Sequence, residues 1–435
     1  MNKTTNSCRR LLTVLALVVA MVLPAQVWAG ITPAKPSTGD GSSGNPYQIG
    51  NAAELYWFAA YVNGTLTDGT ETNEYVNAVL TRDITVNTGV LKADGSLADD
   101  VSGFTSWTPI GKVAYGNRFL GTFDGRGHTI SGLYFNDANV ENVGLFGINQ
   151  GTIKNVGVIA SYFRGKNTIG AVCGYNKYGT ITDCFGISNL SGGREIGGVC
   201  GHSYHADFTR NYNAGIVLGG AAVGGVCGEI SYCNTVSDCY NTGSVTCNGN
   251  GTAPDVGGVF GSLYYTTSMT NCYNTGKVNG WGHNTGEICG LVQGASFSNC
   301  YYLASSSDDA GGKTAAQFAS GEVTWLLNGK QPTGAWGQLL GTDNLPMLDN
   351  TNKVYYGYPS CDKNEGIRYA NTELSETRPA HKHVNGICSV CSEWQPATYV
   401  ASSGLYEIGN AGLLAWFGLL VNGTLPVGTA QNTAA

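Results

Sequence analysis

A four-residue pattern of glycine, an aliphatic residue, Cys or Phe, and glycine returns six times between residues 144 and 290, twice with Ala or Glu in place of the first glycine. The last glycines of the copies lie at positions 147, 174, 201, 228, 261 and 290, so the steps are 27, 27, 27, 33 and 29 residues. A near-fixed period of this length is typical of stacked supersecondary units and not of a single globular core. The period therefore predicts a solenoid.

A second column, of Asn and Asp, keeps nearly the same period. Its members are Asn155, Asp183, Asn211, Asp238, Asn271 and Asn299. Because Asn and Asp tolerate the left-handed backbone conformation and bond their own backbone, the column predicts a corner that is repeated in every turn. We read each repeat as two short strands with a glycine-rich bend, in a parallel β-solenoid of six to seven turns over about residues 120–303. The adjacent Val199 and Cys200 cannot both face inward in a straight strand, and the pattern leaves this point open.

The composition and the N-terminus indicate an exported protein. Only 12% of the residues are charged, and 64 of 435 are glycine. Residues 1–29 combine Arg9 and Arg10 with a short apolar run and a small residue at Ala29, as in a signal peptide cleaved after Ala29. Cleavage removes three positive charges and changes the net charge from −7 to −10. We expect a secreted or cell-surface protein that does not insert into a membrane after cleavage and does not bind nucleic acid.

Most of the 14 cysteines fall into the same register. One column holds Cys173, Cys200, Cys227 and Cys289, and the other holds Cys184, Cys239, Cys272 and Cys300. Parallel side chains of identical orientation rarely reach the dihedral angle of a disulfide, so we interpret these cysteines as small buried apolar residues. Ladder disulfides are the alternative, and Cys233 and Cys247 form the more favourable pair.

The remaining chain divides by composition. A helix is predicted over residues 52–62, with Leu55, Phe58 and Val62 on one face, and a second helix over residues 314–327. The predicted divisions are a linker at 30–46, an N-terminal cap and first strands at 47–142, repeats at 143–303, a C-terminal cap at 304–349 and a loosely ordered linker at 350–380.

The repeat core at residues 144–147, Gly-Leu-Phe-Gly, resembles the GLUG-motif repeats of bacterial surface and adhesin-like proteins. Residues 121–130, Gly-Thr-Phe-Asp-Gly-Arg-Gly-His-Thr-Ile, are similar to the strand ahead of such repeats and to right-handed β-helix proteins. The resemblance covers about residues 45–345. It implies an all-β, right-handed parallel β-solenoid with short capping helices, and it implies no shared chemistry. Some relatives carry metallopeptidase domains, but this chain has no His-Glu-x-x-His motif.

Five aromatic residues occupy the same place in successive repeats. They are Phe185, Tyr212, Tyr240, Tyr273 and Tyr301. If the rings face outward, they form a flat stripe on which sugar rings could stack. If they face inward, they pack the repeats together, which is the interpretation that we favour.

A cluster of potential metal ligands lies at residues 381–396. His381, His383, Cys388 and Cys391 provide four nitrogen and sulfur ligands, which suit a structural, tetrahedral zinc ion. The segment has few apolar residues, so a metal would explain its order. A Cys388–Cys391 disulfide or a disordered segment are the alternatives.

A longer repeat ends the chain. The hexapeptide at residues 47–52 returns at residues 406–411 as Tyr-Glu-Ile-Gly-Asn-Ala, and the match continues to Leu425. We expect a helix at about residues 411–421, and we interpret residues 397–435 as the start of a second, truncated module of a longer surface protein.

Two functions fit these patterns. The first is an exported, non-catalytic, adhesin-like repeat protein that binds extracellular glycans or proteins or acts as a surface spacer. The alternative is a carbohydrate-active β-helix enzyme of the pectate-lyase type, which would need clustered carboxylates on one face. Asp124, Arg126 and His128 alternate along one segment, but we interpret them as parts of a tight turn.

Overall fold

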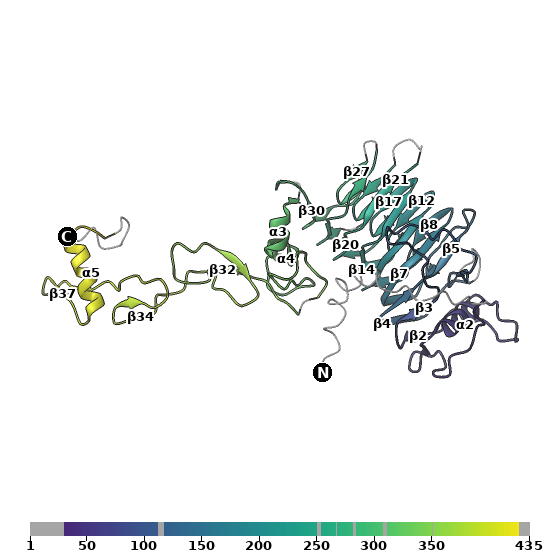
Figure 1. Cartoon of the computed structure of the whole chain (residues 1–435), viewed down its shortest axis with the longest axis horizontal. Helices are drawn as coiled ribbons and strands as arrows, with labels where there is room; N and C mark the ends of the chain where they lie inside the picture. Colours follow the sequence, from purple (N-terminus) through teal and green to yellow (C-terminus); the bar gives the residue numbers. More distant parts are fainter. Residues whose placement is uncertain are drawn as a thin grey trace.

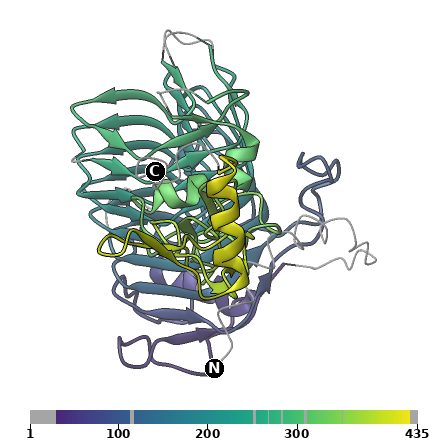
Figure 2. The ribbon, with the colours of Figure 1, turned by 90° about the vertical axis from the view of Figure 1, so that its left-hand side faces the viewer.

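The computed structural model describes residues 30–111, 117–249, 254–266, 268–281, 284–307, 311–349 and 351–425. The predicted signal peptide, residues 1–29, lies outside this range, as do residues 426–435 of the predicted second module. The described residues form a parallel β-solenoid of about nine turns with a few short helices, which confirms the predicted fold class. Figures 1 and 2 show the turns as layers that rise from the purple first turn to the green last turns.

The first turns begin earlier than the repeat pattern indicates. Strand β1 pairs with β2, β2 with β4 and β4 with β7, all in parallel. The stack therefore starts at Tyr47, and this start explains why there are more turns than the six to seven predicted. The strands of this part are β1 (Tyr47–Ile49), β2 (Ala78–Leu80), β3 (Ile84–Thr85), β4 (Thr122–Ser131), β5 (Tyr134–Asn136), β6 (Phe146–Asn149) and β7 (Thr152–Arg164).

Each later turn contains four or five short strands and not the two that we predicted. The first two such turns hold β8 (Asn167–Gly170), β9 (Cys173–Lys177), β10 (Thr180–Thr182) and β11 (Phe185–Ser191), then β12 (Arg194–Gly197), β13 (Cys200–Tyr204), β14 (Asp207–Thr209), β15 (Tyr212–Asn213) and β16 (Ile216–Gly219). The next two hold β17 (Ala221–Gly224), β18 (Cys227–Ser231), β19 (Thr235–Ser237), β20 (Tyr240–Asn241) and β21 (Ser244–Cys247), then β22 (Val256–Gly257), β23 (Phe260–Tyr264), β24 (Met269–Thr270), β25 (Tyr273–Asn274) and β26 (Val278–Asn279). The last turn holds β27 (Thr285–Gly286), β28 (Cys289–Gln293), β29 (Phe297–Ser298) and β30 (Tyr301–Leu303), and β31 (Gly312–Lys313) pairs with β30.

The bend inside the repeat motif explains how Val199 and Cys200 both face the interior. Strand β12 ends at Gly197 and β13 begins at Cys200, so the chain turns between them. The backbone N–H groups of Val199 and Cys200 both donate to the carbonyl oxygen of Val226 in the next turn, at 2.9 and 3.1 Å. Both side chains are fully buried. The motif is thus a corner and not part of a straight strand.

The predicted Asn/Asp corner is confirmed at five of its six positions. Asn155, Asp183, Asp238, Asn271 and Asn299 have φ between 52° and 58°. The prediction was wrong by one residue at Asn211. Thr182 pairs with Thr209, which places Arg210, with φ 57°, at the corner. Asn211 instead takes the place of Cys184, whose backbone N–H it accepts at 3.0 Å.

Every cysteine among the described residues is a free thiol, and Cys233 and Cys247 are among them. The column cysteines are buried, apart from the half-buried Cys289 in the last turn. This agrees with their interpretation as apolar residues of the core.

The N-terminal helix α2 (Ala52–Val62) has the bounds that the sequence predicts. The side chain of Asn51 accepts the backbone N–H of Glu54 and caps the helix. The helix buries Leu55, Trp57, Phe58, Ala59 and Val62. The ring of Phe58 lies 6.2 Å from that of Phe119 and 6.0 Å from that of Phe123, so the helix packs on the first turns of the stack.

The predicted helix at 314–327 is broken into α3 (Ala315–Ala319) and α4 (Glu322–Leu327). Gly321 between them has φ 92°, which a continuous helix does not allow. The two helices pack against Tyr240 and Tyr273 on the flank of the solenoid. Val292, Phe297 and Leu303 of the last turn remain exposed, so this segment does not lie over the end of the stack as a cap would.

Residues 351–425 form a series of small hairpins that ends in a helix (Figure 1). The antiparallel pairs are β32 (Tyr355–Gly357) with β33 (Arg368–Ala370), β34 (His383–Val384) with β35 (Ile387–Cys388), and β36 (Thr398–Val400) with β37 (Leu405–Glu407). Helix α5 (Ala411–Val421) lies where the internal repeat predicts it. No helix in the described part of the chain has the length and apolar character that a membrane span requires.

Candidate functional site

An exposed column of aromatic rings runs along one corner of the solenoid. Tyr178, His205, Tyr232 and Tyr265 each follow the last residue of a strand, in β9, β13, β18 and β23 respectively. Their steps of 27, 27 and 33 residues equal those of the glycine motif. Because these strands pair in register, the four side chains lie one above another. We call this set the aromatic ridge.

The rings of the ridge stack on one another. Adjacent centroids are 5.7, 5.1 and 5.3 Å apart, with interplanar angles of 28°, 14° and 20°. Tyr178, Tyr232 and Tyr265 are 58%, 43% and 51% exposed. The faces of the inner rings are turned toward their neighbours, so the ridge presents ring edges to solvent.

The backbone under the ridge is in the left-handed region. The φ values of Tyr178, His205, Tyr232 and Tyr265 are 64°, 48°, 56° and 49°. For a residue other than glycine or Asn this conformation costs about 1–2 kcal/mol. Ring stacking offsets part of the cost, at about 0.5–1.5 kcal/mol per pair. The Asn/Asp corner shows how the fold meets the same geometry with less strain, so the corner alone does not explain aromatic residues here.

Polar groups lie at both ends of the ridge. The ammonium group of Lys177 lies 5.5 Å from the centroid of the Tyr178 ring. The side-chain amide of Gln293 donates to the hydroxyl of Tyr265 at 3.1 Å. The ridge ends at Gly294, the corresponding residue of the next turn, where a Cβ atom would lie 2.7 Å from Cδ1 of Tyr265. The arrangement is a row of apolar edges with polar groups at its limits, which is typical of a contact surface.

The aromatic stripe that the sequence predicts is also stacked, but it is partly covered. Phe185, Tyr212, Tyr240 and Tyr273 follow one another with centroid distances of 4.7, 4.6 and 4.9 Å and interplanar angles of at most 10°. Tyr240 is 2% exposed and Tyr273 is fully buried.

The cover of the stripe comes from residues 312–349. The rings of Phe318 and Trp336 lie 5.7 and 5.4 Å from that of Tyr273, whose hydroxyl donates to the carbonyl oxygen of Pro346 at 2.8 Å. Tyr301 is half-buried beside Lys313. A binding role stays a prediction for the half-exposed rings of Phe185 and Tyr212.

A cluster of three thiols and one imidazole lies among the C-terminal hairpins. One ligand atom each from Cys361, His381, Cys388 and Cys391 lies within 4.8 Å of all the others. The Sγ atom of Cys361 is 3.4 Å from that of Cys388 and 3.7 Å from that of Cys391. Nδ1 of His381 is 3.2 Å from Sγ of Cys391. The pKa of Cys388 is lowered to about 5, chiefly by the backbone N–H of Cys391.

His383 is not part of this cluster, and Cys361 takes the place that we predicted for it. Strand β34 begins at His383, whose Cα pairs with that of Cys388, so His381 lies before the strand and need not share a side with His383. Nε2 of His383 is buried without a hydrogen-bond partner among the described residues. Cys361 is the one cysteine after residue 30 that belongs to neither column and to neither predicted pair. An unassigned cysteine was the sequence feature that could have indicated a further ligand.

A second cluster of potential metal ligands consists of Glu195, His202 and Glu229, whose ligand atoms also lie within 4.8 Å of one another. Nδ1 and Nε2 of His202 lie 3.6 Å from the carboxylates of Glu195 and Glu229, and Nε2 also lies 2.8 Å from Oγ of Ser231. Burial lowers the pKa of His202, but the Glu195 carboxylate outweighs this effect, and the net shift is upward. Both carboxylates therefore face the imidazole of His202.

Asp124, Arg126 and His128 lie within strand β4, whose pairing with β7 shifts register between Asp124 and His128, so the segment is an irregularity in a strand and not the tight turn that we predicted. The Asp124 carboxylate accepts the backbone N–H of Arg126 at 2.9 Å and the side-chain amide of Asn155 at 3.0 Å. Arg126 has φ 50°. His128 is paired instead with Asp83, at 3.3 Å. The alternating residues therefore do not converge on one catalytic centre.

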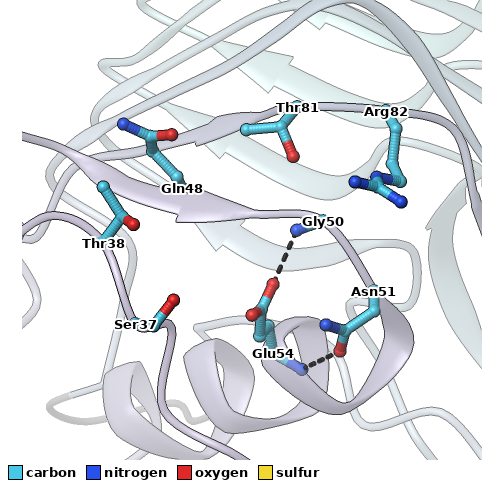
Figure 3. Close-up of a pocket in the computed structure, with 8 residues that line it drawn as sticks. All are labelled: Ser37, Thr38, Gln48, Gly50, Asn51, Glu54, Thr81 and Arg82. Carbon is cyan, nitrogen blue, oxygen red and sulfur yellow. Dashed lines mark hydrogen bonds between the residues drawn. The ribbon is translucent and has the colours of Figure 1, made fainter.

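A polar depression lies beside the first turn, and polar groups that line it form hydrogen bonds with one another (Figure 3). Its lining residues are Ser37, Thr38, Gln48, Gly50, Asn51, Glu54, Thr81 and Arg82. The Glu54 carboxylate accepts the backbone N–H of Gly50 at 2.7 Å, and Asn51 caps the same helix. These polar atoms stabilise the start of α2.

No protein-family model matches the chain, so the resemblance to GLUG-motif repeats stays a prediction. A "Putative Gly-rich membrane protein" of Evansella cellulosilytica is 30% identical over 148 residues, which are 33% of this chain and 14% of that protein. Halomucin of Haloquadratum walsbyi is 29% identical over 158 residues, which are 35% of this chain and 2% of halomucin. The chain therefore matches a small part of the length of either relative.

One solved structure has a similar fold. It is the "putative immunoglobulin A1 protease" of Bacteroides ovatus, with a TM-score of 0.51 and 19% identity, over 72% of this chain and 95% of that chain. At this identity the likeness shows the fold alone. The chain is thus a β-solenoid protein with one relative that is named as a membrane protein.

Proposed function

We propose that this protein is an exported, non-catalytic, adhesin-like surface protein that binds an extracellular protein along the aromatic ridge. The observation that carries the proposal is the stacking of Tyr178, His205, Tyr232 and Tyr265, exposed and in the left-handed backbone region. Left-handed backbone at four successive large side chains is strained, and strain of this kind often accompanies functional surfaces.

The orientation of the rings favours a protein partner over a sugar. Sugar rings bind the flat faces of aromatic side chains, but the inner faces of the ridge contact neighbouring rings. What the ridge offers is a row of ring edges and of Tyr178, Tyr232 and Tyr265 hydroxyls. Tyrosine supplies a large, rigid contact area with a polar tip, at low cost in side-chain entropy, and is enriched in protein interfaces.

The hydrogen bonds and ion pairs around Asp124 and His202 support the non-catalytic part of the proposal. A pectate-lyase-type reaction requires carboxylates that are free to bind a metal ion or substrate on one face. The Asp124 carboxylate instead accepts the backbone N–H of Arg126, and the carboxylates of Glu195 and Glu229 face the half-buried imidazole of His202.

The test compares the full chain after signal cleavage with a ridge variant in which Tyr178, Tyr232 and Tyr265 are each changed to Asn. Asn accepts the left-handed backbone, so the variant removes the rings without new strain. Both proteins, and a Tyr75→Ser control at an isolated exposed tyrosine, are applied to a panel of purified extracellular matrix and mucin proteins and to a glycan array. A polysaccharide-cleavage assay is run beside them.

The expected result is binding to a protein of the panel that the ridge variant loses and the control keeps. Array binding that depends on the ridge would assign a glycan ligand instead. Cleavage of a polysaccharide would overturn the non-catalytic assignment. If the ridge variant binds as well as the wild type, the aromatic ridge is not the binding surface.

A further inference from the structure

The cluster of Cys361, His381, Cys388 and Cys391 has the composition and dimensions of a metal centre. In a tetrahedral zinc site, Zn–S bonds of about 2.3 Å place neighbouring sulfur ligands about 3.8 Å apart. The Sγ–Sγ distances of 3.4 and 3.7 Å and the N–Sγ distance of 3.2 Å are close to this geometry. They are far longer than the roughly 2.05 Å of a disulfide. We propose that these four residues bind one structural zinc ion.

The donor set selects the metal. Three thiolates and one imidazole in a tetrahedral arrangement suit zinc, whereas calcium and magnesium require oxygen ligands. All four positions are filled by the protein, so the ion has no open position for a substrate. The site is therefore structural and is independent of the proposed binding function.

The surroundings orient the ligands as they do in known zinc sites. Nδ1 of His381 faces the sulfur cluster, and its Nε2 lies 3.2 Å from the Glu393 carboxylate. A carboxylate on the second nitrogen fixes the tautomer and ring orientation of a metal-binding histidine. The backbone N–H of Cys388 donates to the carbonyl oxygen of Glu393 at 2.8 Å, which closes the loop that carries Cys388 and Cys391.

The hairpin that carries the cluster has little else to hold it. Val384, Ile387 and Val390 are all exposed, so no apolar core forms around them. Cys361 comes from a separate loop 27 residues before Cys388. An ion shared by both segments supplies the free energy of folding that apolar burial does not.

The hairpin of β34 and β35 also contacts the last helix, α5. The backbone N–H of Gly412 in α5 donates to the carbonyl oxygen of Asn385 at 3.0 Å. A Cβ atom on Gly386 would lie 2.6 Å from Cα of Gly412, so the turn of the hairpin rests directly on the helix. A zinc ion here would therefore join the loop of Cys361 to the hairpin on which α5 rests.

The experiment uses the full chain without its signal peptide, purified under reducing conditions. Metal content is measured by inductively coupled plasma mass spectrometry, and the spectrum of the cobalt-substituted protein reports thiolate ligands. We expect about one zinc per chain, as in other closed four-ligand sites. Cys361→Ser should lose the metal, and His383→Gln should keep it.

The pair of variants separates this site from the one that residue spacing alone predicts, since that site would lose zinc on His383→Gln and keep it on Cys361→Ser. A Cys233→Ser variant controls for zinc bound by other thiols, and the far-ultraviolet circular dichroism of each variant verifies that the solenoid is folded. Full zinc content in Cys361→Ser would overturn the assignment. So would a wild-type protein that contains no zinc under these reducing conditions.

Discussion

A Cβ atom on Gly225 would lie 2.7 Å from the side-chain nitrogen of Asn241, closer than real Cβ atoms approach any other atom. Gly198 meets Asn213 and Gly258 meets Asn274 in the same way. The first glycine of the repeat motif is therefore where a buried Asn rests. The glycine recurs in these three turns because each needs that space, whereas Ala171 and Glu287 hold the same position in two other turns.

Gly225→Ala should destabilise the solenoid by about 1–3 kcal/mol, the usual cost of overpacking a tight interior. The measurement is the urea midpoint of unfolding followed by circular dichroism. Gly103→Ala is the matched control, because a Cβ there meets nothing within 4 Å. Equal midpoints for the two variants would contradict the role assigned to the motif glycine.

The buried Asn column should be as important as the glycines. Asn213 donates to Asn241 at 2.8 Å and Asn241 donates to Asn274 at 2.9 Å, while Oδ1 of Asn241 also accepts the N–H of Gly243 at 3.1 Å. Asn241→Ala leaves these buried partners unsatisfied, at about 1–3 kcal/mol for each lost group. Asn279→Ala, at an exposed Asn of β26, should change stability by less than about 0.5 kcal/mol. The account is wrong here if both variants unfold at the same urea concentration.

The two copies of the helical repeat give a matched pair of leucines. Leu55 in α2 is fully buried, whereas its counterpart Leu414 in α5 is 59% exposed. Both helices begin at an Asn cap with nearly the same backbone angles, so the difference lies in what covers them. Leu55→Ala should cost about 2–5 kcal/mol and Leu414→Ala less than about 0.5 kcal/mol. Thermal unfolding of the two variants measures the contrast, and similar losses would show that α5 is packed as α2 is.

The His202 network should make stability depend on pH. The pKa of His202 is raised above its usual value of 6.5, so its contribution is fully present below pH 6.5 and is lost as pH rises through the folded-state pKa. Burial raises the pKa of Glu195, but the hydrogen bond to His202 outweighs this effect. The pKa of Glu195 is therefore below its usual value of 4.5. The Glu195 contribution is therefore present above pH 4.5 and is lost as pH falls through its folded-state pKa. Melting temperatures of the wild type and of His202→Gln from about pH 2 to 9 cover both pH ranges. A variant that keeps the wild-type decline above pH 6.5 would refute the assignment.

The period predicted the stack because every turn repeats the same contacts, as at Val199 and Cys200. The period placed Asn211 at the corner because Asn is the usual corner residue, although the corner is Arg210, one place earlier. Only the pairing of Thr182 with Thr209 fixes the register. Cys361 was missed because the fold, and not spacing, brings it to Cys388. The ridge keeps the repeat period, but His205 interrupts its run of tyrosines, and exposure cannot be inferred from spacing.

The most direct test of the central claim is the dissociation constant of the partner from the binding panel for wild type and for Tyr232→Asn. Tyr232 lies in the middle of the ridge, stacked between His205 and Tyr265. Removal of a central hot-spot tyrosine from an interface costs about 2 kcal/mol or more, so the dissociation constant should rise at least about 30-fold. Tyr75→Ser should leave it unchanged. An unchanged constant for a folded Tyr232→Asn protein would contradict the assignment of the ridge as the binding surface.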